Sequence, residues 1–137
     1  LPVLPDGVHI LGDCSRSVVS HYFRHAKLFV MPSFFEAFGI AFAEALCNGV
    51  PVIARDTCAM PEIVQQGVNG YLLREDSNSP EELAVLVLEA LSNKELYASV
   101  EASMDRAQSY YSWTRVAEQM RDIIEGDRST VNFTTRV

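Results

Sequence analysis

The arrangement of two apolar runs around a helix-like segment constrains the fold of this chain most strongly. Residues 28–32 are a continuous apolar run, as expected of a parallel strand that is buried on both faces, and residues 51–55 predict the next strand. The segment between them predicts a helix over 39–48 that ends at Gly49. A strand, a helix and a second strand in this order favour a parallel sheet with helices on its faces.

The segments on either side extend this pattern. Apolar runs over 8–12 and 71–73 predict two further strands, so that the sheet would have about four. Helices are predicted from Ser15 or Ser17 to about 27, over 61–65, from Ser79, over about 93–110, and from the cap Thr114 to Gly126. The predicted fold class is therefore α/β, with helices on both faces of the sheet and a helical C-terminal segment.

The last predicted helix carries an apolar face that we expect to point inward. The face is formed by Val116, Met120, Ile123 and Ile124, and Trp113 is expected to pack the helix on the sheet. Residues 1–126 then form one domain, and the polar residues 127–137 are expected to be a disordered tail.

Charge and cysteine content exclude several classes of function. The net charge of −7 argues against a nucleic-acid surface, which needs a basic patch. The three cysteines include no Cys-x-x-Cys pair, a pattern typical of a reduced, cytoplasmic protein without disulfides or a zinc site. No apolar run is long enough to cross a bilayer, and there is no signal-peptide pattern. The chain does not begin with Met, and we expect it to belong to a larger protein.

The segment 32–46 is the candidate functional site. It follows the carboxyl end of a predicted strand, where open parallel sheets bind their ligands. The N–H groups of Phe38, Gly39 and Ile40 at the start of the helix can hold a phosphate. Glu36 and Glu44 can accept hydrogen bonds from sugar hydroxyls, and eight residues of helix would separate them by about 12 Å. This layout suits a nucleotide-sugar.

Each carboxylate also has a structural explanation. Glu36 can complement the dipole at the start of the helix. Glu44 lies among apolar neighbours, where an ionised carboxylate is costly unless it is hydrogen-bonded, and it can pair with a neighbouring arginine instead of a ligand.

The motifs of this segment also carry a family resemblance. In order along the chain these motifs are Pro32-Ser33, Glu36, Phe38-Gly39, Glu44-Ala45, Gly49 and 51–54, followed by 61–64 and by Gly67 and 69–71. This order of motifs resembles the family 4 retaining glycosyltransferases of GT-B fold. The similarity covers roughly residues 8–125. It implies two Rossmann-like domains with the active site between them, of which this chain is similar to the latter part of the C-terminal, donor-binding domain.

The resemblance also implies roles for single residues. Glu36 would bind hydroxyls of the donor sugar, Glu44 the ribose, and the amides of residues 38–40 the phosphates. Backbone near Leu11, Gly12 and Asp13 would lie against the base. The implied substrate is a UDP- or GDP-sugar, and the implied reaction is transfer with retention of configuration, without a cofactor or an obligatory metal.

Two departures from the family pattern limit these expectations. Relatives usually carry an Arg and a Lys on earlier strands, which neutralise the diphosphate, and both those strands and the acceptor-binding N-terminal domain are missing here. We therefore assign no catalytic residue and predict that the chain alone has no transferase activity. In the second departure, a loop that often contains a Gly-Gly pair in relatives reads Thr57-Cys58-Ala59-Met60 here.

The partners follow from the same resemblance. The last helix returns towards the other domain in relatives, and the family allows peripheral membrane contact of the full enzyme. The bare edge of the predicted sheet would also allow two copies to pair as a dimer.

Two other functions fit parts of the sequence. A phospho-receiver module has the same kind of sheet, and Asp13 and Asp56 follow predicted strands, but Pro32-Ser33 stands where its phosphorylated Asp is needed. A nucleotide-sugar epimerase of the same fold would use the same donor site without an acceptor. A phosphorylase would need a lysine for its cofactor, and Lys27 and Lys94 both lie on predicted helices.

Overall fold

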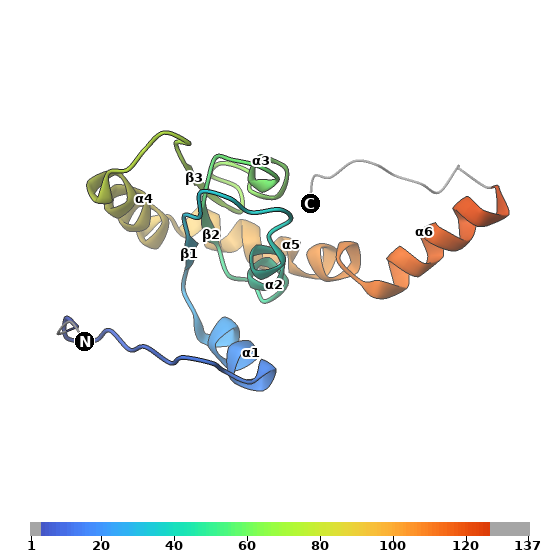
Figure 1. Cartoon of the computed structure of the whole chain (residues 1–137), viewed down its shortest axis with the longest axis horizontal. Coiled ribbons are helices and arrows are strands. Elements are labelled where there is room, and N and C mark those ends of the chain that lie inside the picture. Colours follow the sequence, from blue (N-terminus) through green and yellow to red (C-terminus); the bar gives the residue numbers. More distant parts are fainter. Residues whose placement is uncertain (1–3, 127–137) are drawn as a thin grey trace.

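A three-stranded parallel sheet is the centre of the molecule. The computed structural model describes residues 4–126, so the predicted tail over 127–137 lies outside the described residues. The strands β1 (Phe29–Met31), β2 (Val52–Arg55) and β3 (Gly70–Leu73) lie side by side in the order β1-β2-β3. The described helices are α1 (Arg16–His25), α2 (Ile40–Cys47), α3 (Met60–Ile63), α4 (Pro80–Ser92), α5 (Lys94–Tyr110) and α6 (Trp113–Glu125) (Figure 1). The predicted α/β class is confirmed.

The central unit β1-α2-β2 forms as its sequence predicts. All four residues of β2 are buried, and Val52 pairs with Phe29 on one side and with Gly70 on the other. Helix α2 packs on β2 and on α5, which explains why it is apolar on most of its surface. The largest fully buried side chains of the core are Phe42, Ile53, Met60, Leu96, Val50, Val52, Val64, Val100 and Pro51.

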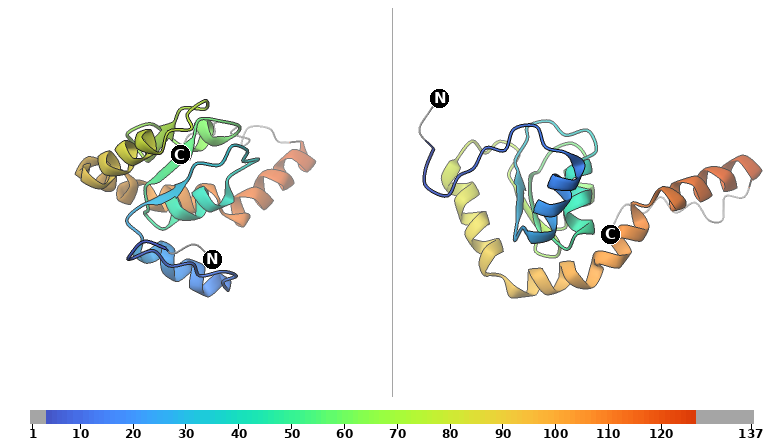
Figure 2. Two further views of the ribbon diagram at one scale, coloured as in Figure 1. Left: turned by 60° about the vertical axis from the view of Figure 1, so that its left-hand side comes forward. Right: turned by 90° about the horizontal axis from the view of Figure 1, so that it is seen from below.

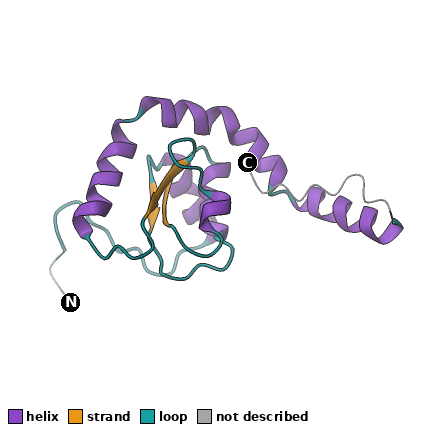
Figure 3. Ribbon diagram, turned by 90° about the horizontal axis from the view of Figure 1, so that it is seen from above, coloured by secondary structure: helices purple, strands orange, loops and turns teal. Residues whose placement is uncertain are grey.

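Helices α4 and α5 curve around the sheet (Figure 3). Their starts follow local capping rules: the Ser79 hydroxyl accepts a hydrogen bond from the Glu82 N–H (3.2 Å), with Pro80 at the first helical position. The Asn93 side chain accepts from the N–H of Leu96 (3.1 Å) and so caps α5. Helix α4 then packs on β3.

The segment 8–12 does not form the strand that its apolar pattern predicts. Ile10 is 76% exposed and Leu11 is 50% exposed, and the segment lies apart from the sheet and close to α1 (Figures 1 and 2). A strand exists only where a neighbouring strand completes its ladder of hydrogen bonds, and no described residue offers that ladder here. The described part of the chain therefore has three strands rather than four.

Helix α6 also differs from the prediction. The hydroxyl of Ser112 accepts from the Arg115 N–H (3.1 Å), so Ser112 rather than Thr114 is the cap. The helix projects away from the body of the molecule (Figures 1 and 3), and Trp113 and Ile124 are 86% and 84% exposed. The predictions that the apolar face of this helix points inward and that Trp113 packs on the sheet are wrong, since no residue of α6 is buried. An amphipathic pattern indicates that one face can be covered by a partner, but not where that partner lies. None of the described helices is long and apolar enough to span a membrane.

Candidate functional site

The loop that leaves β1 and the start of α2 form the centre of the candidate site. Gly39 precedes the helix with a φ of +82°, a left-handed conformation that glycine adopts without strain. Its carbonyl accepts the hydrogen bonds of the Phe42 and Ala43 N–H groups, which sets the first turn of α2. Within the described residues, the N–H groups of Phe38 and Ile40 make no hydrogen bond, and both side chains are exposed. This helix start therefore offers free donors at the carboxyl edge of the sheet.

Glu36 points back to this helix start. Its Oε1 accepts a hydrogen bond from the Gly39 N–H at 3.1 Å, and the side chain is half-buried. The carboxylate thus complements the positive end of the helix, as its structural explanation predicts. The same bond means that one of the three amides predicted for a phosphate is already occupied. A phosphate at Gly39 has to displace the Glu36 carboxylate, which frees it for another ligand group.

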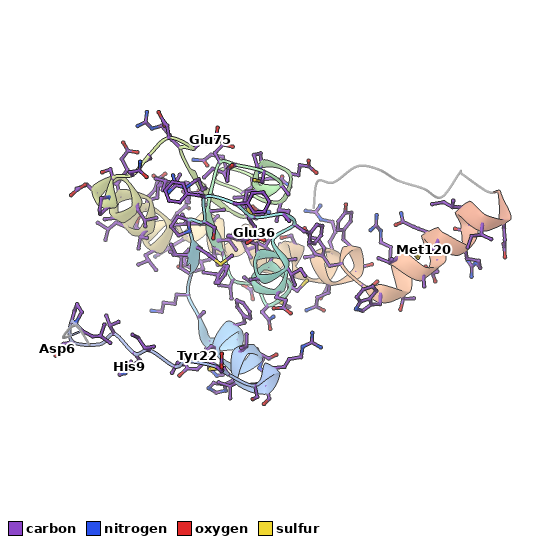
Figure 4. The ribbon with its side chains drawn as sticks, viewed as in Figure 1. Asp6, His9, Tyr22, Glu36, Glu75 and Met120 are labelled. Carbon is purple, nitrogen blue, oxygen red and sulfur yellow. The ribbon has the colours of Figure 1, made fainter. Side chains whose placement is uncertain are left out.

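The spacing of the two carboxylates is not that of a continuous helix. Helix α2 begins only at Ile40, so Glu36 lies in the preceding loop and Glu44 on the first turns of the helix. The rise of 1.5 Å per residue that gave the estimate of about 12 Å applies to only part of the eight-residue step. Figure 4 shows Glu36 in the body of the molecule beside α2, whereas Met120 lies far away on α6.

Glu44 borders a cavity of about 730 Å³ between α1, α2 and the junction of α5 and α6. The cavity is lined by Arg16, Val19, Ser20, Phe23, Phe38, Ile40, Ala43, Glu44, Cys47, Asn48, Tyr110, Tyr111, Trp113, Arg115 and Val116. The carboxylate is half-buried and forms no ion pair within the described residues, although Arg16 and Arg115 line the same cavity. Open space beside the carboxylate, rather than an arginine partner, explains why it is tolerated in an otherwise apolar helix.

The walls of this cavity raise the pKa of two further groups. Burial raises the pKa of Tyr111 to about 12, with smaller contributions from Tyr110 and Cys47, so its phenol stays protonated at neutral pH. Burial also raises the pKa of the Cys47 thiol, and the negative charge of Glu44 adds to this effect. The thiol and the carboxylate are thus close enough to interact.

The proximity of Cys47 and Glu44 leads to a prediction for thiol labelling. Cys47 should react with iodoacetamide several-fold more slowly than the exposed Cys58 near pH 7.5, because its raised pKa lowers the thiolate fraction. Glu44→Gln removes the carboxylate charge, so the pKa of Cys47 should fall and its labelling should accelerate. Mass spectrometry of the modified peptides measures both rates. An unchanged rate for Cys47 in Glu44→Gln would contradict the proximity, and the rate of Cys58 provides the internal control.

The segment predicted to contact a base is not brought to this cavity. Leu11, Gly12 and Asp13 are exposed, precede α1 in irregular backbone, and none of them lines the cavity. Their role therefore stays a prediction. The described residues also contain no group of three or more His, Cys, Asp and Glu side chains that could hold a metal ion.

Two features of the site were not predicted from the sequence. Arg55, at the end of β2, is only 5% exposed, and its guanidinium donates hydrogen bonds to loops on both sides. Its signal in the sequence is a single charge at the end of a buried apolar strand. In addition, Cys58 has a φ of +52°, a backbone conformation that favours glycine, in the loop where the family resemblance implies a Gly-Gly pair.

A parallel sheet with a free helix start at its carboxyl edge defines a Rossmann-like α/β protein. Residues 3–104 match the family model described as glycosyl transferases group 1. The chain belongs to this family, which confirms the resemblance found in its sequence and disfavours the phospho-receiver interpretation.

Curated relatives point in the same direction. The chain is 30% identical over 118 residues to an uncharacterised glycosyltransferase of Methanocaldococcus jannaschii, covering 86% of this chain and 33% of the relative. It is 33% identical over 109 residues to an alpha-maltose-1-phosphate synthase of Mycolicibacterium smegmatis (72% and 27%). It is 28% identical over 132 residues to a D-inositol 3-phosphate glycosyltransferase of Thermobifida fusca (93% and 30%). The chain thus spans about a third of the length of these relatives.

Proposed function

We propose that this chain is the donor-binding part of a glycosyltransferase that moves a hexosyl group from a nucleotide-sugar to an acceptor with retention of configuration. The observation that carries the proposal is the free helix start at the carboxyl edge of the sheet, with Glu36 on the loop before it and Glu44 beside the cavity behind it. UDP- and GDP-sugars are the first candidate donors, and the proposed reaction needs neither a cofactor nor a metal. A cytoplasmic location is proposed on the cysteine pattern alone.

The arrangement of the strands supports a partial donor domain. The common order of a doubly wound sheet is 3-2-1-4-5-6. Strands β1, β2 and β3 fit positions 4, 5 and 6, and the segment 8–12 fits position 3, at the opposite end of the sheet. We propose that two strands from elsewhere in the protein fill the space between 8–12 and β1. These strands would also bring the basic groups that a diphosphate needs.

The same proposal accounts for two exposed apolar surfaces. Val18, Val19 and Tyr22 of α1 are 38–51% exposed, as expected of a helix whose neighbouring strands are elsewhere. The exposed face of α6 would pack against the acceptor-binding domain. A second copy of the chain on the free edge of β1 is the competing arrangement, and light scattering of the full-length protein distinguishes the two by mass.

A panel of nucleotide-sugars tests the proposed function. A matching donor should raise the melting temperature of the full-length protein, because a ligand at 100 times its Kd adds about 2.7 kcal/mol to the stability of the folded state. Glu36→Ala and Glu44→Ala should each weaken donor binding by roughly 10- to 100-fold, the effect of one hydrogen bond to a charged group. Glu101→Ala, an exposed acid on α5, is the matched control.

Two outcomes would contradict the proposal. One is a panel in which no nucleotide-sugar stabilises the parent protein, and the other is normal binding by both carboxylate variants. Turnover of a labelled nucleotide-sugar by the isolated 137-residue chain would overturn the separate prediction that this part is inactive alone.

A further inference from the structure

Arg55 is the buried cation of the described core. The other buried polar residues, Asn69 and Ser77, are neutral, whereas Arg55 is charged and only 5% exposed. No carboxylate forms an ion pair with it within residues 4–126. Burying a guanidinium in this way is costly unless its N–H groups are hydrogen-bonded. The contacts that compensate this cost therefore show what the residue holds in place.

These contacts join the loops that leave β1 and β3. The Nε of Arg55 donates to the Pro32 carbonyl at 3.2 Å, on the loop after β1. Its Nη1 donates to the carbonyls of Arg74 (3.3 Å), Glu75 (3.0 Å) and Ser77 (2.5 Å), on the loop after β3. Because β2 lies between β1 and β3, one side chain connects the carboxyl ends of all three strands.

The loop after β1 has few other anchors. The ring of Phe34 lies 4.0 Å from the guanidinium carbon of Arg55, although the Phe34 side chain is 68% exposed. The remaining hydrogen bonds of the segment 32–36 are local: Ser33 N–H to the Met31 carbonyl and Gly39 N–H to Glu36. Phe35, the next residue, is 78% exposed. Burial therefore does not fix the two phenylalanines, and Arg55 supplies the long-range hydrogen bond of this loop at Pro32.

We propose that Arg55, with Phe34 stacked on it, is a positioning residue that sets where the Glu36 carboxylate stands at the donor site; this rests on the proposed function. The guanidinium donates a hydrogen bond to the Pro32 carbonyl through Nε and stacks on the ring of Phe34. Pro32 and Phe34 both lie in the loop just before Glu36. Of the amides proposed for the phosphate, Phe38 and Gly39 directly precede α2 and Ile40 begins it, and this helix start is set by Gly39 and the core. We call the contacts of Arg55 with Pro32 and Phe34 the clamp. Loss of the clamp should therefore weaken binding of the sugar end of a donor more than binding of its diphosphate.

Two neighbouring phenylalanines allow a matched test in the full-length protein. Phe34→Ala removes the stacking without opening the core, and Phe35→Ala is the control in the same loop. Affinity is measured for a nucleotide-sugar from the panel and for its nucleoside diphosphate, and amide hydrogen exchange is measured at Ser33 and Gly39. Phe34→Ala should weaken nucleotide-sugar binding by about three- to tenfold, in line with the range for cation–π contacts, and change diphosphate binding by less than about twofold. The Ser33 and Gly39 amides should exchange at least several-fold faster.

Conservative variants separate positioning from a general structural role. Phe34→Tyr keeps the ring and should restore the parent values. Arg55→Lys keeps the charge but loses the planar fork, so it should shift both readouts in the direction of Phe34→Ala. The proposal is overturned if Phe34→Ala matches Phe35→Ala, or if sugar and diphosphate binding fall equally. If the parent binds no nucleotide-sugar, the proposed function fails, whereas the clamp itself is still judged by hydrogen exchange.

Discussion

Replacing Gly70 with alanine is expected to destabilise the fold by about 3 kcal/mol or more, the upper end of the overpacking range, because the neighbouring backbone cannot move. A Cβ at Gly70 would lie 2.1 Å from the carbonyl oxygen of Val52 and 2.8 Å from its Cγ2. Val52 is fully buried in the central strand and pairs with both neighbouring strands. Its backbone can therefore move away from the added Cβ only if hydrogen bonds between the strands are broken. The close approach of β3 to β2 therefore requires glycine at this position.

Urea unfolding followed by circular dichroism measures this effect. With an m value of about 1–3 kcal/mol/M, the midpoint of Gly70→Ala should fall by at least about 1 M. Gly67→Ala is the matched control, because Gly67 has a φ of +74° but open space around its missing Cβ. Its cost should be limited to about 1–2 kcal/mol for the left-handed conformation. Equal midpoints for the two variants would show that the contact with Val52 is not limiting.

Gly39→Ala is expected to cost about 2–4 kcal/mol and to weaken donor binding together with stability. Its φ of +82° accounts for about 1–2 kcal/mol. The added Cβ would also lie 2.5 Å from Cε of Met60 and 3.0 Å from Cδ2 of Phe42, which are both fully buried. The methyl end of Met60 is flexible and can yield in part, so this overlap should cost less than the backbone contact at Gly70.

A double-mutant cycle isolates the steric part of this cost. In a Met60→Ala background the 2.5 Å overlap is removed and only the 3.0 Å contact with Phe42 remains, so Gly39→Ala should cost less there, close to the roughly 1–2 kcal/mol of the left-handed conformation. Gly49→Ala provides the conformational control, because Gly49 has a φ of +73° and its added Cβ would meet only Met104 at an ordinary 3.5 Å. Additive costs for Gly39→Ala and Met60→Ala would contradict the steric explanation.

The central unit of the fold could be predicted because its signals are local. The apolar run before Pro32 and the run after Pro51 form β1 and β2, and Gly49 follows the end of α2. Ser79 caps α4 through a hydrogen bond to a residue three positions away. Such signals act within one helical turn or along one strand, so they do not depend on the rest of the molecule.

The candidate site was predictable in its residues but not in its contacts. Glu36 and Gly39 were identified by their position after a strand, yet the hydrogen bond between them appears only once the loop is folded. Arg55 was missed because its acceptors are carbonyl groups about twenty residues away on either side, and a carbonyl has no sequence signature. Glu44 was expected in an apolar environment, whereas packing leaves it beside a cavity.

The sequence by itself determined the class of the fold, the parallel unit around α2 and the family, because hydrophobic periodicity, capping and motif spacing are properties of neighbouring residues. Only the tertiary structure decided that 8–12 is not a strand, that Trp113 is exposed and that Arg55 joins the loops at the carboxyl ends of the strands. Strand pairing and burial depend on what lies opposite a segment, and this is set by distant parts of the chain.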